Sequence, residues 1–364
     1  MSISVKNLSI PETTNSVLSQ YISTNQDNSK LPSFCQLSAS EIVIDSTITL
    51  ESTHSESISE SIITDEVLSQ TNSDTELSDI ELVVFSDISY KLLIAMVSQC
   101  QLTINALNAI NHRNNQVSYR FNVSTSSLSQ SRELLAQFLL ENTIEAALLS
   151  KAPQLSIPGL LVMDMDSTTI EIECIDEIAI LAGVGEQVAA VTEQAMQGEL
   201  DFSESLHQRV LTLKGSSEQI LADVAKNIPL MPGLKTLIQH LKEHNWRIAI
   251  ASGGFTYFAE HLENMLGLDA SFANQLEIQD GKLTGKVLGD VVDAQAKADS
   301  LNILSERYSI SANQTVAMGD GANDLVMMAS AYLGVAFHAK PIVLAQADSS
   351  INHQGLDCLL HWLK

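Results

Sequence analysis

Two aspartates separated by a single residue, Asp164 and Asp166, are the best candidates in this sequence for carrying out chemistry. They directly follow an apolar run, Leu160 to Met163, which predicts a short strand buried on both faces. In a parallel sheet, the carboxyl ends of the strands form the edge at which ligands bind. A pair of carboxylates at that edge favours a catalytic or metal-binding role, and the alternative is a solvated turn after a strand.

Three more polar segments occupy comparable places further along the chain. Ser252-Gly253-Gly254 follows a predicted strand and opens a predicted helix, Lys297 lies at the start of another helix, and the segment Gly319 to Asp324, with the sequence GDGAND, follows a further strand. Alone, these segments could be a simple turn, a charge on a solvated helix face and an acidic loop. A parallel sheet would carry all of them to one edge, however, so their order in the chain predicts a single site.

The elements that must position these residues alternate regularly within residues 151–364, which we predict to be the catalytic domain. Strands separated by helices imply right-handed crossovers, so we expect an α/β fold with a doubly wound parallel sheet. The dipeptide Asp280-Gly281 predicts a tight hairpin between residues 276–279 and 282–287. The predicted strands are residues 160–163, 246–251, 271–276, 314–318 and 333–336, and the predicted helices are residues 234–244, 255–266, 294–308 and 324–331.

A block of helical patterns follows the first predicted strand and extends over about residues 171–228. Apolar side chains recur at helical spacing in Ile175 and Ile178, and again in Leu206 and Val210. This pattern predicts two or more amphipathic helices that pack on each other. Because the block is inserted next to the acidic pair, we expect it to form a helical cap over the site.

The chain changes composition twice before the predicted catalytic domain. Residues 1–79 are rich in Ser and Thr, which predicts a mostly flexible segment with one strand-like island at residues 41–50. Residues 80–150 predict a small α+β domain, and two roles stay open for it: sensing a regulatory ligand, or packing two copies of the chain as a homodimer. Its predicted elements are strands at residues 82–85 and 117–123 and helices at residues 89–110 and 129–149.

The composition argues against several classes of protein. The 364-residue chain carries a formal net charge of −25, which argues against binding to nucleic acid or to an anionic membrane surface. No apolar run approaches the roughly 20 residues that span a bilayer, and the first residues lack the apolar centre of a signal peptide. The four cysteines are scattered without metal-binding spacing, which is typical of reduced thiols. We therefore expect a cytoplasmic protein with neither a membrane nor a nucleic acid as partner.

Taken together, the segments DMDST, SGGF and GDGAND and the lysine between the last two resemble the four motifs of the haloacid dehalogenase superfamily of phosphatases. The resemblance extends over about residues 157–356. It implies hydrolysis of a small-molecule phosphomonoester through an aspartyl-phosphate intermediate, with Mg²⁺ as the cofactor. The substrate that it implies is O-phosphoserine, which would be converted to serine and phosphate in the last step of serine biosynthesis.

The resemblance also implies roles for the acidic residues of the motifs. Asp164 is expected to be the nucleophile, and Asp166 is expected to act as general acid and then general base. The expected ligands of Mg²⁺ are Asp164, the backbone carbonyl of Asp166 and the side chain of Asp320. Asp324 is expected to fix the geometry of this metal site, either directly or through water.

Two charged residues of the predicted cap would select the substrate. The resemblance places Glu173 against the ammonium group and Arg209 against the carboxylate of an amino acid, and the planar fork of Arg suits a carboxylate. Phe202 and Met196 would wall the pocket and exclude water. The residues expected to bind the phosphate group are Ser252, Gly253, Lys297 and Asn323.

Two other functions stay open. The first is a phosphatase of the same fold that acts on another small phosphomonoester, such as phosphohomoserine or a sugar phosphate. The second is a non-catalytic amino-acid sensor with a vestigial catalytic fold. The intact set of motif residues argues against the sensor.

Overall fold

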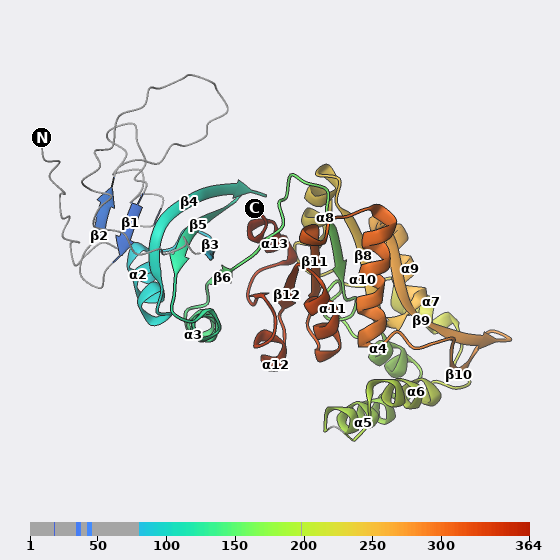
Figure 1. Cartoon of the computed structure of the whole chain (residues 1–364). Coiled ribbons are helices and arrows are strands. Elements are labelled where there is room, and N and C mark those ends of the chain that lie inside the picture. The colour runs from blue at the N-terminus through green and yellow to red at the C-terminus, as the bar shows by residue number, and fades with distance from the viewer. Residues whose placement is uncertain (1–17, 19–33, 38–41, 46–79, 198) are drawn as a thin grey trace, which may run out of the picture. The chain divides into compact units, whose positions relative to one another are not determined.

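The chain divides into two compact units, residues 1–142 and 143–364 (Figure 1). Within the part of the chain that the structure describes, no helix is both long and apolar enough to cross a membrane. The structure is a computed structural model, and it describes residue 18 and residues 34–37, 42–45, 80–197 and 199–364.

Antiparallel strands form the first unit. Its described elements are β1 (Phe34–Leu37), β2 (Ile42–Asp45), β3 (Glu81–Phe85), α2 (Tyr90–Gln99), β4 (Thr103–Arg113), β5 (Gln116–Ser124) and α3 (Leu128–Asn142). β5 pairs antiparallel with both β3 and β4, and β1 pairs antiparallel with β2. β2 falls within the predicted strand-like island at residues 41–50, and the rest of that island lies outside the described residues, as does most of the predicted flexible segment.

The helix predicted at residues 89–110 is wrong in its second half. The helix α2 ends at Gln99, and the long strand β4 begins at Thr103. A positive φ of 56° at Gln101 stops the helix. The turn into β5 is made by Asn114 and Asn115, with φ angles of 41° and 62°, and an Asn pair with two positive φ angles is typical of a tight hairpin. The Asn pair is therefore the sequence signal for a hairpin between β4 and β5 at this point of the chain.

The helix predicted at residues 129–149 is wrong at its end. The helix α3 stops at Asn142, and Thr143 has a positive φ of 51°. Residues 145–149 form a strand, β6 (Glu145–Leu149), in which every side chain is buried. A run of five residues buried on both faces has no alternation, so periodicity alone could not separate it from a helix.

A seven-stranded sheet forms the core of the second unit, in the order β10-β9-β8-β7-β11-β12-β13. Five of its neighbouring pairs are parallel, and the β9–β10 pair is antiparallel. This confirms the expected α/β fold with a largely parallel sheet. The strands are β7 (Leu160–Met163), β8 (Arg247–Phe255), β9 (Ala270–Gln279), β10 (Lys282–Leu288), β11 (Thr315–Gly319), β12 (Leu333–Phe337) and β13 (Ser349–Ile351). The helices that connect the strands are α8 (Leu234–Glu243), α9 (Thr256–Leu266), α10 (Ala294–Tyr308), α11 (Leu325–Ser330) and α12 (Pro341–Leu344), and α13 (Leu359–Trp362) follows the last strand.

The central strand β7 is buried on both of its faces, as its sequence predicts. Leu160 and Val162 belong to an apolar cluster that contains residues of α10 and α11, such as Leu301. Leu161 and Met163 point to the opposite face, because side chains alternate along a strand, and both are fully buried. The strand therefore reaches the edge of the sheet in a fixed position, and Asp164 is the first residue beyond it.

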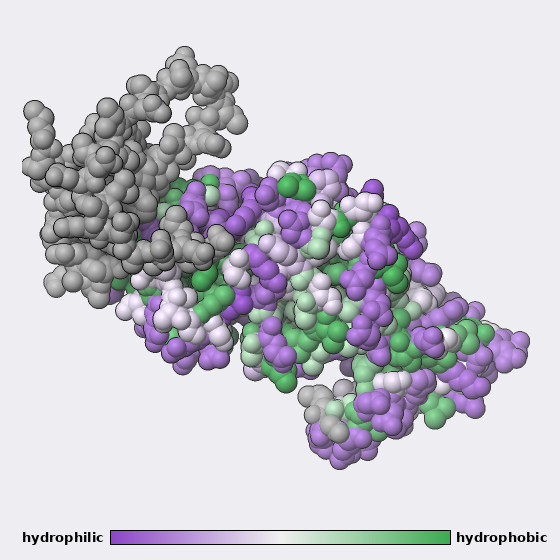
Figure 2. Space-filling view, viewed as in Figure 1, coloured by the Kyte–Doolittle hydropathy of each residue, from purple (hydrophilic) through white to green (hydrophobic). Residues whose placement is uncertain are grey.

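The inserted helical block forms a cap, as predicted. Its helices are α4 (Cys174–Leu181), α5 (Gly185–Met196), α6 (Phe202–Thr212) and α7 (Gln219–Ala225). The two chain crossings between cap and core pair with each other, because the N–H of Glu171 donates to Pro229 O at 3.0 Å and the N–H of Met231 donates to Thr169 O at 3.0 Å. In Figure 2 the cap projects from the body of this unit, and a notch separates the two on the face shown.

The β9–β10 hairpin holds the far end of the cap. Its turn is the predicted Asp280-Gly281 pair, with positive φ angles of 53° and 71°. The N–H of Gly215 in the cap donates to Leu283 O at 2.8 Å, and the N–H of Leu283 donates back to Ser216 O at 2.9 Å. The cap is therefore fixed by backbone hydrogen bonds at its junction with the core and again at this hairpin.

Candidate active site

The acidic pair begins where β7 ends. Asp164 is 6% exposed, and its Oδ1 accepts a hydrogen bond of 2.7 Å from the N–H of Met165. The hydroxyl of Thr169 donates to the Asp164 carbonyl at 2.6 Å, and the N–H of Asp164 donates to Met318 O on β11 at 2.9 Å. Neighbouring strands and the following turn therefore fix both the backbone and the side chain of Asp164.

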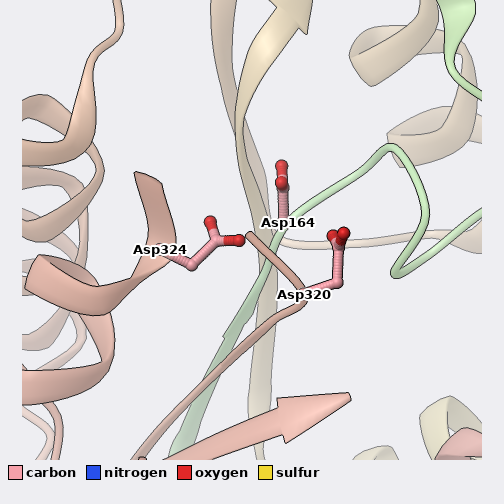
Figure 3. A group of neighbouring side chains, drawn as sticks. All are labelled: Asp164, Asp320 and Asp324. Carbon is pink, nitrogen blue, oxygen red and sulfur yellow. The ribbon is translucent and has the colours of Figure 1, made fainter. Parts of the chain in front are cut away.

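A cluster of three carboxylates surrounds this strand end. One oxygen each from Asp164, Asp320 and Asp324 lies within 4.8 Å of the other two, and the three side chains come from the ends of β7 and β11 and from the turn after β11 (Figure 3). The hydroxyl of Thr168 donates to Asp320 Oδ1 at 3.1 Å. Burial, followed by the charge of Asp164, raises the pKa of Asp320 to about 6. Crowded carboxylate oxygens of this kind suit a hard divalent cation, so the cluster could hold a metal ion.

Lys297 lies beneath the cluster and links two of its members. Its side chain is fully buried, with Nζ 3.0 Å from Asp164 Oδ2 and 2.7 Å from Asp324 Oδ1. Burial opposes the charge of this ammonium, but the two carboxylates outweigh it and raise the pKa of Lys297. Burial, followed by Asp164, raises the pKa of Asp324 to about 7, although Lys297 acts in the opposite direction. Lys297, which was predicted to bind the phosphate group, is therefore in direct contact with Asp164.

The Ser252-Gly253-Gly254 segment differs from the expectation in one respect. The extended backbone of β8 continues through Phe255, so these residues lie at the end of the strand and precede the helix α9 instead of opening it. Ser252 is almost fully buried, and its Oγ accepts from the N–H of Gly254 at 2.9 Å. The loop thus reaches the same sheet edge as Asp164, although by continuing the strand.

A buried asparagine that the sequence analysis did not single out holds this loop in place. Asn274 on β9 is 1% exposed, and its Nδ2 donates to Gly253 O at 2.8 Å. Its Oδ1 accepts from the N–H of Val292 at 2.8 Å. A single Asn in a strand of alternating character has the pattern of an ordinary solvent-facing residue, so the sequence contained no signal for this role.

Asp166 lies between the loop and the cap. Its Oδ1 accepts from the N–H of Cys174 at 3.2 Å, and a Cβ added at Gly254 would lie 2.9 Å from its Oδ2. Burial, followed by the charges of Glu173 and Asp164, raises the pKa of Asp166 to about 8. A carboxyl group with such a pKa can hold a proton at neutral pH, which a general acid must do.

The cap closes over these groups and leaves a cavity of about 650 Å³. Most of the predicted site residues line this cavity, whereas Lys297 and Asp324 lie outside its lining, behind Asp164. The predicted residues that line it are Asp164, Asp166, Glu173, Phe202, Arg209, Ser252, Gly253, Asp320 and Asn323. The fold thus brings together residues that are widely separated in the sequence.

Charged side chains of the cap face into the cavity. The hydroxyl of Ser167 donates to Glu173 Oε1 at 2.8 Å, and burial, opposed by this bond, raises the pKa of Glu173. The Arg209 Nε is buried and has no hydrogen-bond partner among the described residues. Burial lowers the pKa of Arg209, and the charge of Asp176, which also lines the cavity, opposes that shift. Asp176 was not predicted, because its position in an amphipathic helix gives no sign that it faces a cavity.

An aromatic contact joins the cap to the Ser252-Gly253-Gly254 loop. Phe202 is the first residue of α6, which begins with a capping box made by Asp201 and Glu204. A Cβ at Gly253 would lie 2.5 Å from the Phe202 Cζ, so the ring rests directly on the glycine. The predicted pocket wall at Phe202 is therefore in place, whereas the side chain of Met196 lies outside the described part of the structure.

Comparison with known proteins gives consistent results. The sequence model of the family described as "Hydrolase: haloacid dehalogenase-like hydrolase" matches residues 159–331. The chain is 58% identical over 224 residues to the phosphoserine phosphatase of Haemophilus influenzae, which covers 62% of this chain and 71% of that protein. A solved structure described as a probable phosphoserine phosphatase from Vibrio cholerae, in its unliganded form, is 44% identical with a TM-score of 0.65, over 79% of this chain and 88% of that chain. A substrate-bound phosphoserine phosphatase is 40% identical with a TM-score of 0.54, over 57% of this chain and 99% of that chain.

The fold, the acidic cluster and these similarities define the class of the protein: the chain belongs to the haloacid dehalogenase-like hydrolases. Phosphatases of this family use a metal ion, and the cluster of Asp164, Asp320 and Asp324 could bind one. Within the family, the chain is similar to phosphoserine phosphatases, and the three relatives agree on this point.

Proposed function

We propose that this chain hydrolyses O-phosphoserine to serine and phosphate, the last step of serine biosynthesis, through an aspartyl phosphate formed on Asp164. The observation that carries this proposal is one cavity in which a pair of acids from the core faces an arginine and a glutamate from the cap. The core residues suit phosphate chemistry, and the cap residues suit the charged groups of an amino acid. The similarity to phosphoserine phosphatases supports the same reaction.

Asp164 and Asp166 divide the chemical work. A carboxylate oxygen of Asp164 attacks phosphorus while the bond from phosphorus to the seryl oxygen breaks. Asp166, with its pKa raised to about 8 by burial and by Glu173 and Asp164, gives its proton to the departing seryl oxygen. The Asp166 carboxylate then takes a proton from a water molecule, which attacks the aspartyl phosphate, frees Asp164 and releases phosphate.

The attack brings two anions together, so cationic and dipolar groups must offset their repulsion. Lys297 Nζ, 3.0 Å from Asp164 Oδ2, is the buried positive charge at the nucleophile. The Ser252 hydroxyl, the N–H of Gly253 and the side-chain amide of Asn323 are the proposed donors to the phosphate oxygens. All three residues line the cavity beside the acidic pair, which supports this assignment.

The proposed cofactor is Mg²⁺, held by the side chains of Asp164 and Asp320 and by the backbone carbonyl of Asp166. The carboxylate cluster supports it, because Mg²⁺ prefers hard oxygen ligands. When bound, the ion would neutralise charge on the phosphate group as a Lewis acid. Asp324 accepts from Lys297 Nζ at 2.7 Å and from the N–H of Gly321 at 3.0 Å. Since both of its oxygens already accept hydrogen bonds, we propose that Asp324 organises the site and reaches the ion through water.

Arg209 and Glu173 are proposed to recognise the serine part of the substrate. The buried Arg209 Nε lacks a partner among the described residues, so a substrate carboxylate would satisfy a donor that is costly to leave unpaired. Glu173 is oriented by Ser167 and would accept from the substrate ammonium. Phe202, whose ring rests on Gly253, would help to exclude water from the cavity.

Initial rates with Mg²⁺ on a panel of phosphomonoesters test this proposal. We expect kcat/KM for O-phosphoserine to exceed that for glucose 6-phosphate by about 100-fold or more, because only the former offers a carboxylate and an ammonium. A preference for an ester that lacks both groups would contradict phosphoserine as the substrate. Absence of hydrolysis with every ester would instead favour the non-catalytic sensor.

The cellular setting is a further part of the proposal. We propose that the enzyme works in the cytoplasm, and the described cysteines, which are free and buried, are consistent with a reducing compartment. We also propose that residues 80–150 form a regulatory-like or dimerisation domain. Light scattering with and without serine would test both roles of that domain.

A further inference from the structure

Lys340 is a cation at the cavity that was not predicted from the sequence and has no role in the proposed mechanism. It follows the strand β12 and comes directly before Pro341, the first residue of α12. The N–H of Lys340 contacts Asp320 O at 3.5 Å, which ties its backbone to the acidic loop after β11. The side chain is exposed, yet it also contributes to the lining of the cavity. Lys340 thus lies where the cavity meets the solvent.

The charges that line the cavity are unfavourable for an anionic substrate. Its lining includes five carboxyl groups, those of Asp164, Asp166, Glu173, Asp176 and Asp320, and only Asp166 among them is proposed to hold a proton as the general acid. Arg209 and Lys340 are the cationic side chains of the lining, and the chain as a whole carries a net charge of −25. The proposed Mg²⁺ would offset the charges of Asp164 and Asp320, whereas Glu173, Asp176 and the net charge of the chain oppose the approach of a phosphate dianion, over a range of about 10 Å at 0.1 M salt.

The two lining cations have different positions and therefore different uses. Arg209 lies on the cap helix α6 and has a buried Nε, so it can act only after a ligand has entered. The third cation of the site, Lys297, is fully buried and paired with Asp164 and Asp324. Among the described residues, no carboxylate forms an ion pair with Lys340, so its charge is available to an approaching anion.

We propose that Lys340 attracts the phosphate dianion at the mouth of the cavity and raises the rate of productive substrate binding without taking part in the chemical step. This inference rests on the proposed phosphatase function, because the phosphate dianion is the group that Lys340 would attract. Because the attraction acts through solvent, it must weaken as the salt concentration rises.

Variants that remove only the charge test the inference. Lys340→Met keeps most of the length and the apolar stem of the side chain, and Lys340→Arg keeps the charge. At an ionic strength of about 10 mM, we expect Lys340→Met to lower kcat/KM for O-phosphoserine by roughly 3- to 10-fold, with kcat within about twofold of the unmutated enzyme. At about 0.5 M salt the difference should shrink to less than about twofold. Lys340→Arg should restore most of the loss.

Lys286→Met is the matched control, because it makes the same change in net charge. Lys286 is exposed on β10, the edge strand, which β9 and β8 separate from β7, and it is not part of the cavity lining. We expect its kcat/KM to follow that of the unmutated enzyme at both salt concentrations. An equal loss in both variants would mean that net charge alone matters and would overturn the assignment to Lys340.

Two further outcomes separate this inference from the proposed function. If the unmutated enzyme hydrolyses O-phosphoserine and Lys340→Met loses the same activity at low and high salt, with a fall in kcat, then Lys340 contacts the reacting group or supports the fold and the attraction model is wrong. If the unmutated enzyme releases no phosphate from any monoester, the proposed function fails first. The inference is also overturned if Lys340→Met equals the unmutated enzyme at about 10 mM ionic strength.

Discussion

At the scale of single residues, the groups that are proposed to react are held differently from those that are proposed to select the substrate. The N–H of Met165 holds Asp164, and the backbone N–H of Cys174, the first residue of the cap helix α4, holds Asp166. Neither of these hydrogen bonds involves the cap side chains that are proposed to recognise the substrate. Arg209, in contrast, belongs entirely to the cap. Substitutions of these two kinds should therefore have different kinetic effects.

Replacement of Arg209 by Ala should affect only substrates that carry a carboxylate. Loss of a charge-assisted contact in a site that excludes water is worth about 2 to 4 kcal/mol, so kcat/KM for O-phosphoserine should fall by roughly 30- to 1000-fold. Hydrolysis of p-nitrophenyl phosphate, which has no carboxylate, should change by only about threefold. Equal losses on the two substrates would show that Arg209 supports cap structure or phosphate binding. Arg247→Ala is the control, because Arg247 lies outside the cavity and pairs with Asp269 at 2.7 Å.

Replacement of Asp166 by Asn should separate the two chemical steps. The p-nitrophenolate group leaves without protonation, whereas hydrolysis of the aspartyl phosphate still needs a general base. We therefore expect rapid-mixing experiments with p-nitrophenyl phosphate to give a burst of about one equivalent of product per enzyme, followed by a steady rate that is lower by roughly 100-fold or more. A slow steady rate without a burst would place the requirement for Asp166 in the first step with this substrate.

At the scale of elements, the cap meets the core through the ring of Phe202 on Gly253. A Cβ at Gly253 would lie 2.5 Å from Cζ of that ring, a separation at which one of the two must move. The contact therefore couples the position of α6, and with it Arg209, to the loop that is proposed to bind phosphate. A substitution in α6 at Phe202 should therefore change the position of the Gly253 loop, and a substitution at Gly253 should change the position of α6.

Replacement of Gly253 by Ala should hold the cap away from the core. We expect kcat for O-phosphoserine to fall by roughly 10- to 100-fold, because a displacement of about 1 Å in a catalytic geometry has effects of this size. The double variant Phe202→Ala with Gly253→Ala should lose less than the sum of the two single effects, because the smaller side chain removes the collision. Additive effects in this double-mutant cycle would mean that the Cβ disturbs phosphate binding directly.

The elements around the site were predictable from the sequence because their signals are local. The apolar run before Asp164, the Asp280-Gly281 turn and the helix at residues 294–308 all match the structure. The candidate site residues were placed by motif resemblance, and the fold brings them together. Asn274 and Asp176 were missed, because a polar side chain shows only in three dimensions whether it faces a loop, a cavity or the solvent. The two helix ends in residues 80–150 were wrong because strands that are long or buried on both faces lack a clear alternation.

At the scale of the whole molecule, the balance of charge is the dominant feature. The chain has 44 acidic and 19 basic residues, and three of the acids converge at the end of β7 with Lys297 as the one buried cation in contact with them among the described residues. The mutual repulsion of these carboxylates lowers the stability of the folded protein. Binding of a divalent cation should therefore stabilise the folded protein as well as supply chemistry.

Addition of Mg²⁺ should raise the melting temperature of the protein. An ion present at about 100 times its dissociation constant adds about 2.7 kcal/mol of stability, which for a unit of this size corresponds to roughly 5 to 11 °C. Differential scanning calorimetry with Mg²⁺ and with EDTA measures the shift. The Asp320→Asn variant should show little of it, and in EDTA this variant should melt no lower than the unmutated protein, because one repulsive charge is gone. A full Mg²⁺ shift in Asp320→Asn would remove Asp320 from the metal site.

The paired crossings between cap and core, at Ile170 and Leu230, have a consequence for how such proteins can diversify. A segment whose two ends leave the core side by side can be lengthened, shortened or exchanged without moving either end of the chain around it. The proposed nucleophile Asp164 lies before the first crossing. The Ser252-Gly253-Gly254 loop, Lys297 and the segment Gly319 to Asp324 come after the second crossing. Protein engineers could therefore treat residues 171–229 as a replaceable cassette: a cap with a different pocket, joined at the same two points, would redirect the enzyme to another phosphomonoester, provided that it keeps the N–H of residue 174 on Asp166 and the contact of residue 202 with Gly253.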